Sequence, residues 1–433
     1  MVTLLVLVFR IFLNYSFTGN STIIETMKKN IFLMTALLVA GLFGVAVAQS
    51  NPFGNAASAY TLPTFTKNNK GEPVLYWTEK DAANVLSLFF AVSNDGGKSF
   101  GDKKLIFASP LMGSSRLMRP KLLFKKDGSM AAVFSFRNEV AAPAVEEGGH
   151  ANHDKPAAPA PKPKRDLQIR YTVSKDNGQS WTAPASVDSD TSRLTRGFFD
   201  AVVLANDEIA VAYLKDVKGS TKHEERDLRM VITKNGVFQP EKVIDPVVCD
   251  CCNISLLVDN KGVLNVFYRD NNDDIRDIAR MTSANNGSTW TKPEILHDDK
   301  WEIKGCPHSG ATSVATQNGA LVTWFSGAAV QAGVRLATTD GHLLKVLNAN
   351  AKNGTVTADD KQAFFVWEQT TEGGASRILY SKVAGGKAQD DQVLKGSDYG
   401  QNATTLLANG KLLIAHEVAK PNQKTALSVR VVE

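Results

Sequence analysis

The sequence predicts an all-β protein, a β-propeller built from four-stranded antiparallel blades. Two observations lead to this prediction. A turn motif of the form Ser-x-Asp-x-Gly-x-x-Trp/Phe is repeated along the chain, and short apolar strands separated by Asn, Asp and Gly turns fill most of residues 60–433. With 433 residues, the chain is long enough for about seven small sheets in one propeller.

The turn motif has three clear copies. They are Ser93–Phe100, Ser174–Trp181 and Ser283–Trp290, the last with Asn285 in place of Asp. Each copy follows an apolar, β-branched run and precedes another short strand, so each is expected to form a hairpin turn. In such a turn the Asp or Asn side chain accepts backbone N–H groups, Gly takes a positive φ, and the aromatic ring packs beneath the loop.

The repeat continues in weaker form and predicts a blade count. Degraded copies begin at Thr233, Thr338 and Ser381, and the underlying period of about 50 residues is typical of propeller blades. Each repeat also has a first turn followed by an apolar strand, the pattern of an antiparallel hairpin. These turns are Asn68–Gly71, Lys126–Gly128, Asn206–Asp207, Asn260–Gly262, Asn318–Gly319, Asp359–Asp360 and Asn409–Gly410. The turns predict seven blades, the last without an obvious fourth strand.

The motif resembles the Asp-box, or BNR repeat, of the sialidase-like (neuraminidase) superfamily of β-propellers. This resemblance covers most of residues 60–433. The sialidases have six blades, so the resemblance implies six where the turns predict seven, and both numbers remain open. It also implies a glycoside hydrolase of the exo-α-sialidase type, although a fold alone does not determine an activity.

The N-terminal region predicts an export signal. Met27–Ala48 begins with a basic stretch, continues with the apolar run Ile31–Val47 and ends in a small-x-small cleavage site. Residues 1–48 are therefore interpreted as an early start plus this signal peptide, and residues 49–433 as a single propeller domain. The prediction is a periplasmic or secreted protein with no stable membrane insertion after cleavage. An uncleaved membrane anchor is the alternative.

Charge and composition limit the expected partners. The net charge of +5 comes from 49 Lys and Arg against 44 Asp and Glu, a near balance that does not indicate a nucleic-acid-binding surface. A Pro/Ala/Lys-rich insertion at about 141–165, which contains His150 and His153, interrupts the second repeat. It is expected to be a solvated loop, with a weak accessory metal site as the alternative.

Propeller geometry brings many chemically able residues to one face. The innermost strand of each blade starts on the face opposite the Asp-box turns, beside the loops that join second to third strands. Residues in these two places are expected to converge on the channel mouth, where a rigid scaffold holds binding groups. They are Arg116, Arg119, Arg193, Arg196, Asp200, Cys249–Cys252, Tyr268–Asp270, Asp273–Arg276, Cys306–His308 and Asp398–Gln401.

The sialidase resemblance implies a substrate-binding set among these residues. Sialidases hold their acidic sugar with three arginines, because the guanidinium fork binds a carboxylate bidentately and stays charged. The corresponding candidates are Arg119, Arg196 and Arg276. The aromatic-Arg-Ile-Pro motif of sialidases has its nearest match at Met118–Pro120, which lacks the Ile and follows the first turn motif.

The same resemblance implies a catalytic set. Sialidases use a Tyr nucleophile, a Glu that draws off its proton, and an Asp as acid and base. Tyr399 with Glu417, or with Glu368 in its place, and Asp200 are the candidates. The reaction requires no cofactor, and the expected partner is an acidic glycan or glycoconjugate.

The four cysteines, Cys249, Cys251, Cys252 and Cys306, have two interpretations. In an oxidising compartment they pair as disulfides, in any of three ways. Alternatively they join His308 in a soft metal site, since thiolates and imidazole suit copper(I) or zinc. The residues come from the same position in two consecutive repeats and are therefore expected to be neighbours in space.

Two functions follow from these observations. The first is an exported glycoside hydrolase that releases sialic acid or a related acidic sugar. The alternative is a non-catalytic propeller that binds a metal, a glycan or a protein, with the Cys/His cluster at its channel mouth.

Overall fold

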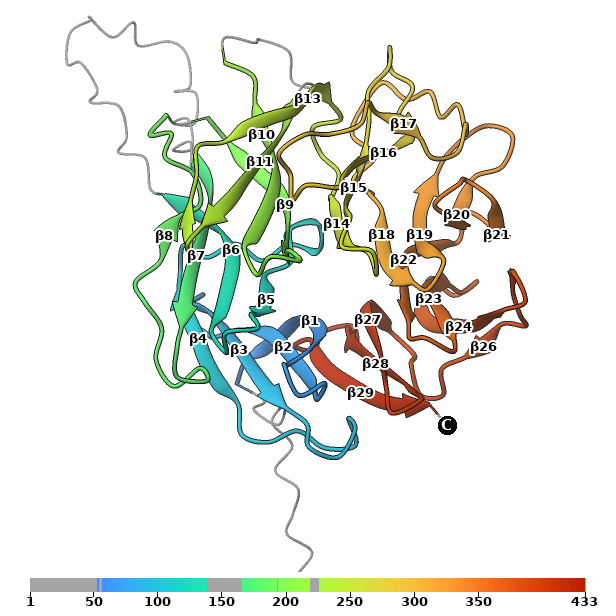
Figure 1. The fold of residues 1–433 in the computed structure, drawn as a ribbon. Helices are drawn as coiled ribbons and strands as arrows, with labels where there is room; N and C mark the ends of the chain where they lie inside the picture. The colour runs from blue at the N-terminus through green and yellow to red at the C-terminus, as the bar shows by residue number, and fades with distance from the viewer. Residues whose placement is uncertain (1–52, 54–56, 139–165, 193, 219–225, 433) are drawn as a thin grey trace, which may run out of the picture. The chain divides into compact units, whose positions relative to one another are not determined.

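Seven small antiparallel sheets form a ring in the computed structural model (Figure 1). The chain divides into two units, residues 1–50 and 51–433. The structure describes residues 53, 57–138, 166–192, 194–218 and 226–432, all of which belong to the second unit.

The first four blades follow one another in chain order. Blade 1 consists of β1 (Ala59–Lys67), β2 (Pro73–Lys80), β3 (Leu86–Val92) and β4 (Lys104–Ser109). A 3-10 turn, η1 (Arg116–Met118), precedes blade 2, which consists of β5 (Lys121–Phe124), β6 (Met130–Asn138), β7 (Asp166–Ser174) and β8 (Ala185–Ser186). Blade 3 consists of β9 (Arg196–Val203), β10 (Ile209–Asp216), β11 (Arg226–Lys234), β12 (Val237–Phe238) and β13 (Lys242–Val248). Blade 4 consists of β14 (Ser255–Val258), β15 (Leu264–Arg269), β16 (Ile278–Ser283) and β17 (Glu294–Ile295).

The remaining three blades complete the ring. Blade 5 consists of β18 (Thr312–Thr316), β19 (Gly319–Ser326), β20 (Gly333–Thr338) and β21 (Leu343–Val346). Blade 6 consists of β22 (Ala351–Ala358), β23 (Ala363–Thr370), β24 (Ser376–Ala384), β25 (Lys387–Ala388) and β26 (Gln392–Val393). Blade 7 consists of β27 (Gly400–Ala408), β28 (Lys411–Val418) and β29 (Ala426–Val432). The all-β propeller is confirmed with seven blades, and within the described residues the last has three strands.

The hydrophobic core lies between neighbouring blades. Because successive side chains of a strand point to opposite faces, the second strand of a blade joins two interfaces. On β10, Tyr213 packs into the cluster shared with blade 2, whereas the next residue, Leu214, packs into the cluster shared with blade 4. Between blades 7 and 1, Leu413 and Trp77 belong to one buried cluster, which closes the ring.

The three motif turns have the geometry that the sequence predicts. In the second copy Asp176 Oδ1 accepts the N–H of Ser180 at 2.9 Å, and Ser174 Oγ accepts the N–H of Gly178 at 2.9 Å. Gly178 has a φ of +77°, and Trp181 packs against the cluster between blades 1 and 2. The equivalent bonds recur in the other two copies. Since each turn follows the third strand of its blade, all three lie on the face opposite the starts of the inner strands.

Several predicted segments lie outside the described residues. They are the signal peptide at Met27–Ala48, its membrane-anchor alternative, and the insertion at about 141–165. Within the described ranges, no helix has the length and apolar character needed to cross a membrane.

Candidate functional site

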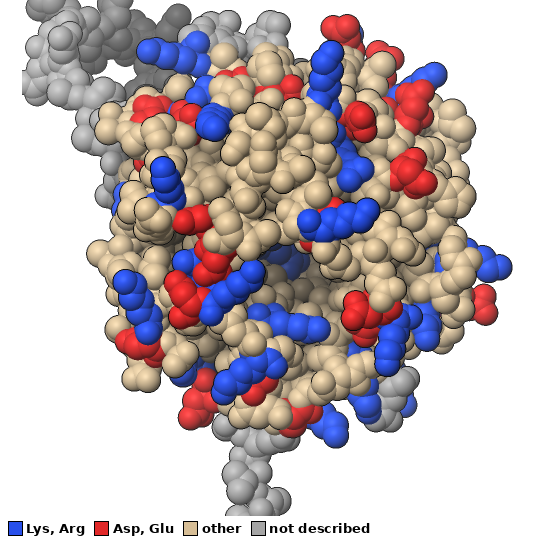
Figure 2. Space-filling view, in the orientation of Figure 1, with Lys and Arg blue, Asp and Glu red and all other residues tan. Residues whose placement is uncertain are grey.

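A central cavity of about 490 Å³ is lined by the first strand of every blade. Figure 2 shows a hollow at the centre of the visible face, with Lys and Arg side chains inside and around it. The volume falls within the range of pockets that hold small ligands. One lining residue from each inner strand illustrates the arrangement: Thr64, Lys121, Asp200, Ser255, Ser313, Thr355 and Thr404.

Two buried glutamates tie blades together at the channel mouth. Four inner strands carry a β-bulge near their start, each with one residue of positive φ. Glu417 accepts the N–H of the bulged Leu62 at 2.7 Å, and Glu368 accepts that of the bulged Asn402 at 2.6 Å. Each glutamate lies on the second strand of the preceding blade. Burial raises the pKa of Glu368, and the bonds to backbone give both carboxylates a structural role.

Three cations give the cavity its positive charge. Arg116, Arg119 and Lys121 all line it. Arg116 donates to the carbonyl of His308 at 3.1 Å, and Lys121 pairs with Asp200 at 2.7 Å. Burial lowers the pKa of both arginines. Burial alone would lower the pKa of Lys121 as well. The neighbouring Asp200 carboxylate outweighs this effect, so the pKa of the lysine is raised.

The three residues predicted to catalyse a sialidase reaction have separate surroundings. Asp200 lines the cavity, where it pairs with Lys121 and accepts the N–H of Leu256 at 2.9 Å. Glu417 is buried and bonded to backbone. Tyr399 precedes β27 and is 36% exposed. Among the described residues, its hydroxyl forms no hydrogen bond with Glu417 or Asp200, and the catalytic role of the three stays a prediction.

The three arginines predicted to bind a carboxylate also lie apart. Arg119 lines the cavity and donates to backbone carbonyls of β1 and β27 at 2.7 and 3.0 Å. Arg196 is fully buried within blade 3, and Arg276 is fully buried beside Cys249. Of the three, Arg119 is the one that borders the cavity.

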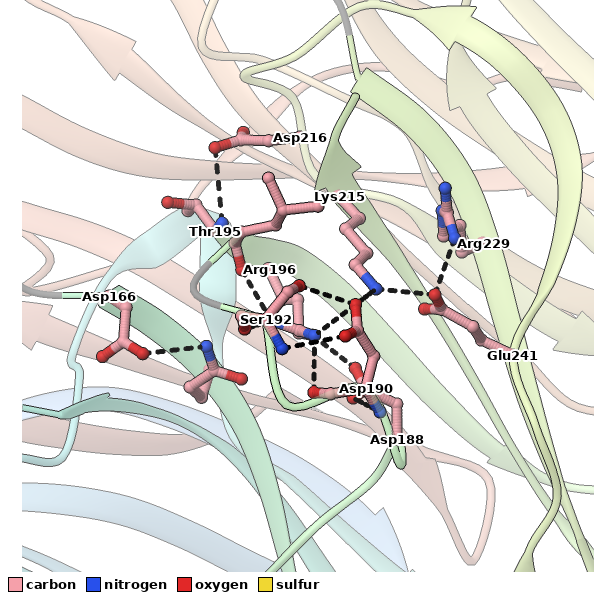
Figure 3. Close-up of polar contacts among 12 residues, drawn as sticks. Asp166, Asp188, Asp190, Ser192, Thr195, Arg196, Lys215, Asp216, Arg229 and Glu241 are labelled. Carbon is pink, nitrogen blue, oxygen red and sulfur yellow. Dashed lines mark hydrogen bonds and ion pairs between the residues drawn. The ribbon is translucent and has the colours of Figure 1, made fainter. Parts of the chain in front are cut away.

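Figure 3 shows the network that surrounds Arg196. Its Nε pairs with Asp188, and its Nη2 pairs with Asp190 at 3.1 Å. Its Nη1 donates to two backbone carbonyls of the loop before β9. Lys215 extends the network by pairing with Asp190 and, at 2.6 Å, with Glu241. The nitrogens of Arg196 are therefore engaged inside blade 3, which indicates a structural role.

The cysteines form a compact cluster at the channel mouth. The sulfur of Cys249 lies 3.9 Å from that of Cys251 and 3.6 Å from that of Cys252, and the latter two sulfurs are 3.8 Å apart. All three residues are buried. The ligand atoms of Cys251, Cys306 and His308 also lie within 4.8 Å of one another, and Cys306 and His308 are exposed. The expected proximity of the two segments is confirmed.

The cysteines are free in the structure, not paired. A disulfide requires a sulfur–sulfur distance of about 2.0 Å, well below the separations within the cluster. The predicted disulfides are therefore absent among these residues in this structure.

Two hydrogen bonds hold the cysteine segments side by side. Asn253 Nδ2 donates to the carbonyl of Ala311 at 2.9 Å, and Asn253 Oδ1 accepts the N–H of Gly310 at 2.9 Å. A Cβ on Gly310 would lie 1.8 Å from the carbonyl oxygen of Asn253, so only glycine allows this approach. The residues just before the inner strands of blades 4 and 5 thus bring the cysteines together.

One arginine contacts the buried thiols. Arg276 Nη1 lies 3.4 Å from the sulfur of Cys249. Contacts with the Cys251 and Cys252 sulfurs, together with Arg276, lower the pKa of Cys249. The pKa of Cys251 is raised by its neighbouring thiols, and that of Cys252 chiefly by burial. The cluster therefore favours a thiolate at Cys249 beside an arginine.

Some residues of the site have weak sequence signals. Lys121 follows Arg119 and Pro120 at the start of an inner strand. This position could have identified it as a residue that lines the cavity. The ion pairs of Lys215 join segments far apart in the chain. No local pattern marks such partners.

Comparison with known proteins supports the fold. Residues 156–369 match the family model described as a BNR repeat-like domain. No curated protein matches the chain. Among solved structures, a protein of unknown function from Dyadobacter fermentans is 16% identical with a TM-score of 0.50, covering 88% of this chain and 97% of that one. An ulvan lyase is 10% identical with a TM-score of 0.52, covering 87% and 94%.

Sialidases also appear among the similar structures. Trypanosoma rangeli sialidase, in complex with the inhibitor DANA, is 13% identical with a TM-score of 0.46, and the match covers 86% of this chain. The chain spans 55% of that sialidase. At 16% and 10% identity, the Dyadobacter fermentans protein and the ulvan lyase support the propeller architecture and no particular activity. The BNR repeat match over residues 156–369 and the seven-bladed ring both agree with the resemblance to sialidase-like β-propellers.

Proposed function

We propose that this protein is an exported propeller that binds a soft metal ion, copper(I) or zinc, at the cysteine cluster. The observation that carries the proposal is the spacing of the three buried sulfurs, 3.6, 3.8 and 3.9 Å. Thiolates bound tetrahedrally to one zinc ion at about 2.3 Å lie about 3.8 Å apart. The thiols therefore have the separations that a shared metal ion requires.

Charge balance supports the same proposal. Three thiolates around a monovalent or divalent ion leave a net negative charge, which is costly to bury without a counter-charge. Arg276 lies beside Cys249, and a donor to a ligating sulfur orients and stabilises it. Cysteine ligands select copper(I) and zinc over magnesium and calcium, which prefer oxygen.

Elemental analysis of the full chain tests this function. We expect copper or zinc near one ion per chain in protein recovered from the periplasm, with four thiols titrating after denaturation. The ion stabilises the thiols against oxidation because its bonds occupy the sulfurs. Protein without bound metal and without free thiols would instead contain disulfides, which would contradict the proposal.

An acidic sugar at the central cavity is the second candidate, favoured by the cations that line it. In this proposal Arg119 binds the sugar carboxylate at the mouth, and the sialidase resemblance adds Tyr399 as nucleophile, Glu417 drawing off its proton and Asp200 as acid and base. The proposal rests on the central cavity of about 490 Å³, which is lined by both Arg119 and Asp200.

Release of sialic acid from sialyllactose tests this second candidate. If it is correct, the full chain releases the sugar, and Asp200→Asn abolishes release while Asp127→Asn, a change at an ion pair on the turn between β5 and β6, does not. Absence of both release and binding of sialosides, with correctly folded protein, would exclude it.

A further inference from the structure

The cysteine cluster contains two overlapping groups of ligands. The first is the buried trio of Cys249, Cys251 and Cys252, and the second is the trio of Cys251, Cys306 and His308. Cys251 belongs to both. The first trio is at most 4% exposed, while Cys306 and His308 are exposed.

We infer, on the basis of the proposed metal-binding function, that the second trio is an exchange position through which soft ions enter and leave the buried trio. An incoming ion first bonds to the exposed Cys306 thiolate and His308 imidazole. Cys251, already within 4.8 Å of both ligand atoms, then bonds to it. Cys249 and Cys252 replace the exposed ligands, so the ion always keeps at least one bond to protein.

This step is a ligand exchange and involves no change of oxidation state. Each thiol that bonds the ion loses its proton to solvent, since the thiolate is the ligand. When the ion leaves the exposed position, Cys306 takes up a proton again. As Cys249 and Cys252 replace Cys306 and His308, two metal–sulfur bonds form while one metal–sulfur bond and one metal–nitrogen bond break. Neither reductant nor oxidant is consumed.

The surroundings of the two trios agree with a binding role for the inner trio and an exchange role for the outer trio. Arg276 is fully buried and contacts Cys249 through Nη1, while its Nη2 pairs with Asp274 at 3.5 Å, so part of its positive charge faces the inner trio. At the outer trio, the imidazole Nδ1 of His308 lies 2.9 Å from the carbonyl of Cys306. Hydrogen bonding of one ring nitrogen fixes the tautomer and leaves the other nitrogen for an ion. Arg116 holds the carbonyl of His308 at 3.1 Å and links this segment to the central cavity.

The inference predicts a specific kinetic result. A residue that only assists the passage of the ion changes the rates of metal uptake and release by the same factor. The affinity of the buried trio stays the same because the residue is not a ligand in the final complex. We expect Cys306→Ser/His308→Ala to bind Cd²⁺ with the parent affinity and to exchange it about tenfold more slowly in both directions. Exchange is measured on reduced apo-protein from the thiolate–cadmium absorption band, first on adding Cd²⁺ and then on adding a chelator.

Three variants complete the experiment. His342→Ala removes an exposed histidine of blade 5 outside the cluster and is expected to exchange at the parent rate. Cys252→Ser is expected to lose affinity. If Cys306→Ser/His308→Ala loses affinity to the same extent, the exposed residues belong to a single site with the buried trio and the inference is wrong. Unchanged exchange rates in the double variant would also overturn it. If the parent binds no Cd²⁺ at all, both the inference and the proposed function fail.

Discussion

Replacing Arg196 with alanine is expected to destabilise the folded propeller by about 3–5 kcal/mol, the cost of leaving a buried charge without its partner. Arg196 and Asp188 have fully buried side chains, and the guanidinium also bonds Asp190 and two backbone carbonyls. The free energy of unfolding, measured by urea denaturation, checks this result.

A surface ion pair supplies the matched control for Arg196. Arg377 and Asp398 pair at 2.7 Å with side chains 50% and 61% exposed. Arg377→Ala is expected to change stability by less than about 1 kcal/mol, as is usual for exposed pairs. If Arg196 served to bind a substrate carboxylate, its removal would leave stability near the parent value, and the structural role argued for it would be wrong.

Cys252→Ser is expected to weaken metal binding by about 100-fold or more. A structural zinc site contributes about 10–16 kcal/mol through roughly four ligands, so one thiolate accounts for a few kcal/mol of binding free energy. Serine keeps the size of the side chain but is a poor ligand for a soft ion. Competition against a chelator of known affinity measures the effect.

The fold of the Cys252→Ser variant must be checked together with its metal affinity. Cys252 is 2% exposed, so a folding defect would also reduce metal binding. Far-ultraviolet circular dichroism of the apo-protein separates the two causes. An apo-variant with the parent spectrum and the parent metal affinity would show that Cys252 is not a ligand.

Much of the fold could be predicted because its signals are local. The motif turns at Ser93, Ser174 and Ser283 need only a short stretch of sequence to form their hydrogen bonds. The seven first turns, each of which joins an inner strand to its neighbour, favour seven blades, while the sialidase resemblance leaves six open. The proximity of Cys251 and Cys306 was also predictable, since they occupy equivalent positions in consecutive repeats.

The roles of individual arginines could not be predicted in the same way. Arg119 and Arg196 hold similar positions in their repeats, yet Arg119 borders the cavity and Arg196 is enclosed by Asp188 and Asp190. What distinguishes them is which carboxylates the fold brings near, a property of tertiary packing. Glu417 illustrates the same point, because its bond to Leu62 joins the last blade to the first.

The most direct test of the metal-binding account is X-ray absorption spectroscopy at the copper or zinc edge of the purified full chain. The account predicts sulfur neighbours at about 2.3 Å from the metal, lost in a variant that lacks Cys249, Cys251 and Cys252. A bound metal with only oxygen or nitrogen neighbours, or a sulfur shell unchanged in that variant, would contradict it.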